Sequence, residues 1–366
     1  MKVLFQSRKT LFTVPGGDTT QILKTKAYLE LLGVVVDISL ELEPDLKDYD
    51  IVHVFNLTRP QELFLQVRNA KRQGKKVALS TIYVDYTEFE RKARGGWLQV
   101  LNNCLPTTTI EYCKVIARAI LNREVNRGTL FYLLYGHKHL QRKIMHMVDV
   151  LLPNSRSEMQ RIVRSFGVLD KQHEVVVNAV DVAVFDYDKT TITPDLEQYR
   201  DCILCVARIE GLKNQLNVIR ACQELPYKLV FVGKASANFH HYYAQCQSEA
   251  AENMHFLGQV PHEQLPQLYK LAKVHVLASW IETTGLSSLE AGVMRTNIVV
   301  TKKGDTEDYF QNFAYYCEPD DVASIRTAIV QAYEQPFDEA FREHILNSYT
   351  WEDTARQTLE GYKKVL

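Results

Sequence analysis

Two glutamates eight positions apart, Glu282 and Glu290, have the type and spacing to do chemistry. Glu282 follows the strand-like run VHVLAS, and Glu290 lies about two turns into the helix that Gly285 is expected to open. The first-turn amides of such a helix, here Leu286 and Ser287, have no helical acceptor and suit a phosphate. A carboxylate two turns further along can accept paired hydrogen bonds from a vicinal diol such as a ribose.

The spacing of the two glutamates is weak evidence by itself, since a loop glutamate and a helix-surface glutamate often occur together by chance. The context strengthens the prediction, because a strand precedes the pair and Thr-Thr-Gly forms the turn at 283–285. Gly285 allows the backbone to approach a ligand closely.

Arg208 and Lys213 form a second cluster, in the segment VARIEGLKNQ, with Gly211 between them. Two cations after a strand can clamp a diphosphate, because arginine supplies a bidentate fork and lysine a compact charge. The alternative is a pair of ordinary loop cations, one of them paired with Glu210.

Weaker signals lie in the first half of the chain. Gly16 and Gly17 follow the first strand and could turn backbone amides toward an anion at a helix start. They form neither a GxGxxG fingerprint nor a P-loop. Tyr83 and Asp85 follow another strand in STIYVDY, and Asp85 is the better candidate for meeting an acceptor hydroxyl. His53 lies inside a strand and is predicted to be a core histidine.

Composition narrows the class of protein. The chain has 366 residues, 46 % hydrophobic and 24 % charged, with a formal net charge of −1. These values are typical of a globular protein of two domains. The net charge is too small to attract nucleic acid by a positive electrostatic field. No apolar run is long enough for a transmembrane helix, and no signal peptide is evident, so we expect a cytoplasmic protein. The seven cysteines suggest no metal site, because Cys202 and Cys205 would point to opposite faces of one strand.

Short apolar runs alternate with amphipathic stretches throughout, which predicts an α/β protein with parallel sheets. We expect a first domain at 1–186, a polar linker at 187–201, a second domain at 202–348 and a terminal helix at 349–366. Residues 88–147 differ from the rest, since Arg and Lys alternate there with Leu, Ile, Tyr and Phe. This stretch could lie on an anionic membrane surface. The alternative is a helical pair with a solvated basic face.

With these segments in view, the chain resembles the retaining glycosyltransferases of family 4. The resemblance rests mainly on VARIEGLKN, FLGQVPHEQLPQLYKLAKVHVLAS, ETTGLSSLEAGV and NIVVT. It implies the GT-B fold, with two Rossmann-like doubly wound domains facing a cleft and a C-terminal helix crossing back to the first domain. Two departures bear on the sugar, because Glu-Thr-Thr-Gly at 282–285 replaces the usual Glu-Gly-Phe-Gly and Tyr83 replaces a frequent histidine.

The resemblance also implies roles for the candidate residues. Arg208 and Lys213 would hold the diphosphate, and Glu290 the ribose. The donor sugar would meet Glu282 and the loop through Thr284, Gly285, Leu286 and Ser287. The amides of Gly16 and Gly17 would contact the distal phosphate, the backbone near Val260 the base, and Tyr83 and Asp85 the acceptor. No metal or other cofactor is implied.

The expected activity is a retaining transfer, of a hexose by preference, from a donor such as a UDP- or GDP-sugar to a glycan acceptor. The acceptor is expected to be lipid-linked, as in surface polysaccharide or lipopolysaccharide synthesis, and the protein peripheral on the inner face of the cytoplasmic membrane. One alternative is a hydrolase or epimerase of nucleotide sugars, with Asp85 as its base. Another is an inactive binding subunit, which predicts loss of Arg208, Lys213 or Glu290, yet all three are present.

Overall fold

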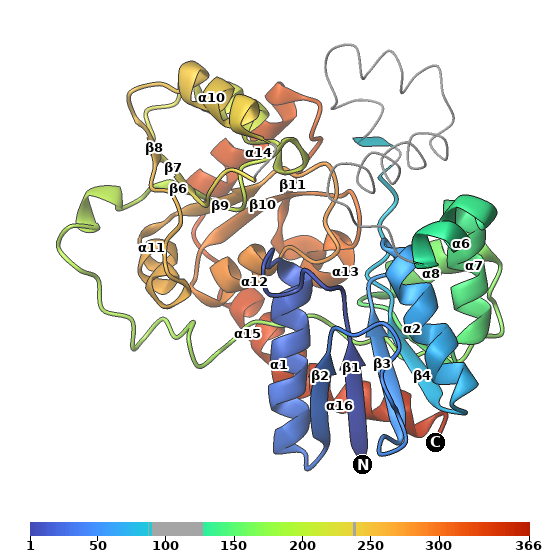
Figure 1. Ribbon diagram of the computed structural model, residues 1–366. Helices are drawn as coiled ribbons and strands as arrows, with labels where there is room; N and C mark the ends of the chain where they lie inside the picture. Colours follow the sequence, from blue (N-terminus) through green and yellow to red (C-terminus); the bar gives the residue numbers. More distant parts are fainter. Residues whose placement is uncertain (87, 90–126, 237–238) are drawn as a thin grey trace. The chain divides into compact units, whose positions relative to one another are not determined.

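The computed structural model describes residues 1–86, 88–89, 127–236 and 239–366 (Figure 1). Most of the basic stretch predicted at 88–147 therefore lies outside the described residues. The described chain divides into two compact units. The first holds residues 1–86, 127–178 and 351–366, and the second holds residues 88–89 and 179–350. Residues 179–186, placed in the first domain from sequence, thus cluster with the second unit.

The first unit contains a five-stranded parallel sheet in the order β2-β1-β3-β4-β5. Its strands are β1 (Lys2–Gln6), β2 (Val35–Ser39), β3 (Ile51–Phe55), β4 (Lys76–Ser80) and β5 (Val150–Leu152). Alternate residues of these strands enter two separate cores, as the two-residue period of a strand requires. Leu4 and Val52 face one core, whereas Val3 and Ile51 face the other.

Helices cover both faces of this sheet (Figure 1). One core takes apolar residues from α2 (Pro60–Arg72), α6 (Arg127–Tyr135), α7 (His137–Met147) and α8 (Arg156–Phe166). The other takes residues from α1 (Gly17–Leu31) and α16 (Trp351–Lys363). The C-terminal helix α16 packs against α1 and β5. The predicted return of the last helix to the first unit is therefore confirmed.

His53 is a core residue, as predicted. It is 1 % exposed, and its ring nitrogens lie 2.7 Å from the Tyr362 hydroxyl and 2.8 Å from the Ser80 hydroxyl. Burial lowers the pKa of His53 to about 3. The neutral ring thus ties β3 and β4 to the C-terminal helix.

The second unit contains a six-stranded parallel sheet in the order β11-β10-β9-β6-β7-β8. Its strands are β6 (Ile203–Val206), β7 (Leu229–Val232), β8 (Met254–Phe256), β9 (Val274–Leu277), β10 (Asn297–Thr301) and β11 (Tyr315–Cys317). The chain builds outward from β6 to β8 and then returns to place β9 on the other side of β6. The boundary between β6 and β9 is therefore a topological switch point, where ligands of doubly wound sheets bind.

The helices of the second unit alternate with its strands, which completes the predicted doubly wound α/β arrangement. They are α9 (Gln215–Cys222), α10 (His240–Glu249), α11 (Leu265–Leu271), α12 (Leu286–Val293), α13 (Thr306–Phe310), α14 (Val322–Glu334) and α15 (Glu339–Ser348). Within the described residues, every cysteine is buried and none forms a disulfide. Also within those residues, no helix has the length and apolarity needed to cross a bilayer.

Candidate functional site

The loops that follow β6 and β9 meet at the switch point of the second unit. Nζ of Lys213, in the first loop, lies 2.5 Å from Oε1 of Glu282, in the second. The two side chains are only 19 % and 8 % exposed, so the ion pair is largely shielded from water. Two residues predicted from separate motifs are therefore in direct contact.

Asn214 and the backbone hold these two loops together. Asn214 has a left-handed backbone with φ 61°, which asparagine tolerates better than most residues. Its side-chain amide donates to the carbonyls of Ala278 (3.0 Å) and Pro319 (2.7 Å). The Trp280 amide donates to the Leu212 carbonyl at 2.9 Å. The position of Lys213 next to Glu282 is thus fixed by buried hydrogen bonds on both sides.

Arg208 lies at the start of the first loop and is half-exposed, with 51 % of its side chain accessible. Its guanidinium donates to Oε1 of Glu210 at 3.3 Å, so the alternative pairing considered from sequence is present. Glu210 is buried and also accepts a hydrogen bond from Ser236 at 2.7 Å. The guanidinium has five N–H donors, so this one contact leaves donors for an anionic ligand.

A third loop, after β10, supports Glu282 through its backbone. The Glu282 amide donates to the Lys303 carbonyl at 3.0 Å, and the Asp305 amide donates to the Glu282 carbonyl at 2.9 Å. Gly304 lies between them with φ 102°, and a Cβ there would be 1.9 Å from the Glu282 carbonyl oxygen. Sequence reasoning missed Gly304, although the Gly-Asp that follows NIVVT was an available signal.

Helix α12 begins where the candidate phosphate site was predicted. Gly285 adopts the left-handed conformation with φ 79° immediately before Leu286. Thr284 is buried, at 1 % exposed, so it shapes the loop from inside. The Ser287 hydroxyl lies 3.3 Å from Nε2 of His275, whose pKa burial lowers to about 4. What this turn offers to a ligand is therefore its backbone amides and the positive end of the helix dipole.

Glu290 is held by two side chains that sequence reasoning missed. The Tyr269 hydroxyl donates to its Oε2 at 2.9 Å, and Nε2 of His262 lies 3.4 Å from its Oε1. Burial, reinforced by the Glu290 carboxylate, raises the pKa of Tyr269 well above its ordinary value. Val260, the predicted base contact, is two residues before His262. The predicted ribose and base contacts thus lie at neighbouring points of the second unit.

Gly16 and Gly17 stand at the start of α1 in the first unit. The Gly16 amide donates to the Thr19 hydroxyl at 3.1 Å, so it is already engaged. The loop before it is organised by Arg8, which pairs with Asp18 at 2.8 and 3.0 Å and donates to the Val14 carbonyl. Gly17 is the first residue of the helix.

Tyr83 and Asp85 follow β4 in the first unit and lie in different surroundings. Tyr83 is 7 % exposed, its ring packs against Phe166, and its hydroxyl donates to Ser165 at 3.1 Å. Asp85 is exposed. The structure therefore puts the Tyr83 ring in the core of the unit, which favours Asp85 over Tyr83 as the side chain that meets an acceptor.

Comparison with known proteins identifies the family. Residues 191–348 match the family model described as Glycosyl transferases group 1. This segment is that of a glycosyl transferases group 1 protein. The matched residues include Arg208, Lys213, Glu282 and Glu290.

Curated relatives are similar at low identity. The chain is 26 % identical over 174 residues to the O-antigen chain mannosyltransferase B of Escherichia coli, covering 44 % of this chain and 45 % of the relative. It is 23 % identical over 243 residues to an N-acetylgalactosamine-N,N'-diacetylbacillosaminyl-diphospho-undecaprenol 4-alpha-N-acetylgalactosaminyltransferase of Campylobacter jejuni, covering 61 % of each. The match thus spans less than two thirds of either relative.

Solved structures establish the fold. Anabaena Alr3699/HepE in complex with UDP-glucose matches the chain with a TM-score of 0.72 at 13 % identity, covering 100 % of both chains. The two parallel α/β sheets and the returning C-terminal helix are those of the GT-B fold, as the sequence predicted.

Proposed function

We propose that this chain is a retaining glycosyltransferase that takes a sugar from a nucleoside-diphosphate donor. The observation that carries the proposal is the contact between Lys213 and Glu282 at the switch point, with Arg208 on the same loop as Lys213. A site built from two cations and a helix N-terminus suits a diphosphate. The family membership of residues 191–348 supports the same reading.

The donor would lie along the second unit from the ion pair to Glu290. Its diphosphate would meet Arg208, Lys213 and the first-turn amides of α12. Its ribose hydroxyls would donate to Glu290, whose carboxylate Tyr269 already orients. The binding of UDP-glucose by Alr3699/HepE supports a donor of this type. The base would be met by backbone near Val260.

The proposed transfer step depends on stabilising the negative charge that develops on the leaving diphosphate. As the bond between the sugar and the diphosphate breaks, negative charge grows on the leaving phosphate, and fixed cations beside it lower the barrier. The acceptor hydroxyl would attack the same face of the sugar, and a departing phosphate oxygen would take its proton. Glu282 would contact the donor sugar while holding Lys213 in place. In this scheme no protein nucleophile is required.

We propose a lipid-linked glycan as the acceptor and a hexose as the transferred sugar. The names of two relatives support this choice, since one is an O-antigen chain mannosyltransferase and the name of the other includes a diphospho-undecaprenol glycan. Asp85, exposed after β4, would meet the acceptor hydroxyl. Synthesis of a surface polysaccharide or lipopolysaccharide is the matching role.

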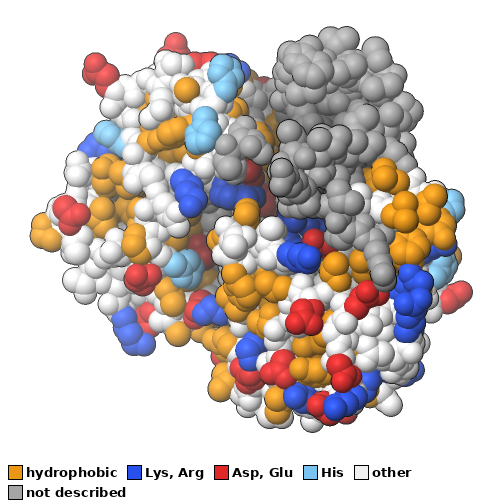
Figure 2. Space-filling view, viewed as in Figure 1, with side chains coloured by type: hydrophobic (Ala, Val, Ile, Leu, Met, Phe, Trp, Pro, Cys, Tyr) orange, Lys and Arg blue, Asp and Glu red, His pale blue; other side chains and the backbone are white. Residues whose placement is uncertain are grey.

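A lipid-linked acceptor would bring the protein to a membrane, and α6 and α7 supply a suitable surface. Leu130 and Leu134 on α6 are 59 % and 69 % exposed, and Lys138 and Arg142 on α7 are exposed. No acidic residue occurs from 127 to 148. Figure 2 shows hydrophobic side chains gathered on this part of the first unit. We propose that this face rests on an anionic membrane surface at the inner face of the cytoplasmic membrane.

Product analysis tests the proposed activity. The protein is incubated with a panel of UDP- and GDP-sugars and a lipid-linked or short-chain glycan acceptor, and the anomeric configuration of the product is read by NMR. Transfer with retention is the expected result. An inverted product contradicts the mechanism. Release of free sugar at the same rate with and without acceptor indicates the hydrolase alternative instead.

A further inference from the structure

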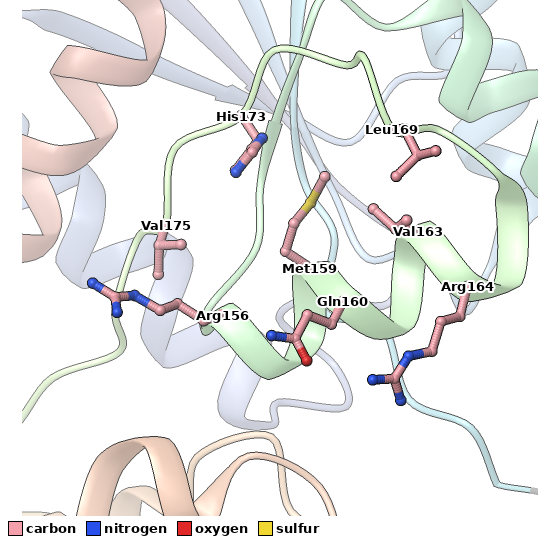
Figure 3. Close-up of a pocket in the computed structure, with 8 residues that line it drawn as sticks. All are labelled: Arg156, Met159, Gln160, Val163, Arg164, Leu169, His173 and Val175. Carbon is pink, nitrogen blue, oxygen red and sulfur yellow. The ribbon is translucent and has the colours of Figure 1, made fainter.

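A hollow of about 530 Å³ lies on the first unit, between α8 and the extended segment that follows it (Figure 3). Its volume is in the range of ligand pockets. The segment 172–176 runs beside β5, with hydrogen bonds from Leu151 to the Gln172 carbonyl and from Glu174 to the Leu151 carbonyl. One wall of the hollow is therefore the extended segment beside β5, and the other is helix α8.

Apolar side chains line the hollow together with Gln160 and His173, and Arg156 and Arg164 add positive charge. Met159 and Val163 of α8 face Leu169 and Val175 across it. Arg156 reaches from the first turn of α8 toward Val175, as Figure 3 shows. The side chains that line the hollow include no carboxylate. An apolar body with an anionic head is the ligand chemistry that such a lining complements.

The charge of Arg156 is not neutralised by an acidic side chain within the described residues. Arg156 is exposed, and among the described residues it forms no ion pair. The carboxylates nearest in sequence are committed to other partners. Glu158 is fully buried and accepts from the amides of Tyr83 and Asn154, and Asp149 pairs with Lys71 at 2.7 Å.

The hollow begins near the edge of the sheet where we expect the acceptor to bind. Helix α8 starts just after the carboxyl end of β5, so Arg156 lies at the same edge of the sheet as the loops carrying Gly16 and Asp85. Because strands of a parallel sheet point the same way, ligands gather at that edge.

We propose that this groove binds the lipid diphosphate portion of the acceptor, with the diphosphate at Arg156 and the first apolar units over Met159, Val163 and Leu169. This inference rests on the proposed function for the identity of its ligand. It adds a binding site that lies outside the donor residues of the second unit. The glycan attached to the diphosphate would then extend from the Arg156 end, at the edge that carries Asp85.

Farnesyl diphosphate, a soluble lipid diphosphate, serves as the probe in a calorimetric titration of the full chain. Inorganic pyrophosphate and farnesol are titrated separately, so that the head and the apolar body are tested alone. We expect farnesyl diphosphate to bind at least about tenfold more tightly than either part, since each supplies only some of the contacts. No binding of farnesyl diphosphate, or equal binding of pyrophosphate, overturns the proposal.

Three variants locate the site. Arg156→Ala removes the charge, and Leu169→Asp places a carboxylate on a side chain that is 73 % exposed, so neither disturbs the core. Each is expected to weaken farnesyl diphosphate binding by about tenfold or more. Arg72→Ala, at an exposed arginine of α2, is the matched control and should bind like the wild type. Wild-type binding by both groove variants overturns the proposal.

Titration of UDP and GDP into the same preparations separates this inference from the proposed function. Retained nucleotide binding with no effect of the groove variants rejects the groove alone. If the wild type binds neither UDP nor GDP, but binds farnesyl diphosphate in a way that depends on Arg156, the proposed donor site is rejected and the groove proposal stands.

Discussion

Lys213 and Glu282 form an ion pair of 2.5 Å between loops that follow two neighbouring parallel strands, β6 and β9. The pair lies 69 positions apart in sequence and is largely buried. Each charge is therefore stabilised by the other. Glu282 holds the lysine where a diphosphate would need it, and the lysine compensates a carboxylate that burial would otherwise destabilise.

Lys213→Met is predicted to lose both stability and activity. It leaves Glu282 buried without its cation, which costs on the order of 3 kcal/mol in the free energy of unfolding. Turnover should fall on the order of 10²–10³-fold. The double variant Lys213→Met with Glu282→Gln should regain most of the stability, as measured by denaturant unfolding, but not the turnover. Full turnover in either variant would show that the lysine has no role at the reacting phosphate.

Arg208→Ala is predicted to lose activity with a smaller loss of stability than Lys213→Met, because the buried Glu210 keeps its hydrogen bond from Ser236. Its side chain is 51 % exposed, so few packing contacts are lost, whereas the charge that we propose to lie beside the leaving phosphate disappears. Turnover should fall on the order of 10²–10³-fold. The control is Arg200→Ala, which removes an exposed arginine paired with Glu197. Equal turnover in the two variants would refute the assignment of Arg208.

Tyr269→Phe is predicted to weaken nucleotide binding. The change deletes the hydroxyl that donates to Glu290 and leaves the ring in place. The hydrogen bond that orients the carboxylate is lost, which should weaken the free energy of nucleotide binding by about 1 kcal/mol. Calorimetry with UDP or GDP should show an affinity lower by about fivefold. Tyr349→Phe is the control, because its hydroxyl donates to the Asp308 carbonyl instead. An affinity that is equal in both variants would mean that Tyr269 does not position the carboxylate.

Gly304→Ala is predicted to displace the Glu282 loop. The added Cβ would lie 1.9 Å from the Glu282 carbonyl oxygen, and φ at this position is 102°. We expect a loss of a few kcal/mol in the free energy of unfolding together with loss of turnover. Gly258→Ala is the control, since its φ is 69° but nothing lies within 4 Å of the added atom. Similar behaviour of the two variants would show that close approach to Glu282 is not the cause.

Two buried histidines predict loss of stability in mild acid. Burial lowers the pKa of His53 to about 3 and that of His275 to about 4, both from 6.5. The unfolded chain therefore binds protons first as the pH falls. The histidines should not reduce the free energy of unfolding above pH 6.5, and this free energy should decline as the pH drops through 6.5 toward 4.

Denaturant midpoints measured across that pH interval test this prediction. His139→Gln, at an exposed histidine, should keep the wild-type slope of stability against pH, whereas His275→Asn should reduce it. Identical slopes in the wild type and His275→Asn would contradict the role of the buried ring.

The alternation of strands and helices, and the strand–loop–helix unit that carries the candidate donor residues, could be predicted from sequence because both are local signals. Glu282, Gly285 and Glu290 lie within one strand–loop–helix unit, whose order determines where its polar groups go. The supporting residues could not be predicted in this way. Tyr269 meets Glu290 from another helix, and Gly304 matters only because the β10 loop folds back on Glu282.

The placement of Tyr83 shows a different limit. A regular strand would alternate its side chains, but Ile82 has φ 43°, which ends the alternation after β4. The Tyr83 ring consequently turns into the core, against Phe166. A left-handed residue that is neither glycine nor asparagine has no clear sequence signal.

A crystal structure of the chain with UDP or GDP bound is the decisive test of the proposed donor site. We expect the phosphates at Arg208, Lys213 and the first turn of α12, with the ribose hydroxyls on Glu290. A nucleotide bound elsewhere, with Arg208 and Glu290 making no contact to it, would refute the proposed donor site.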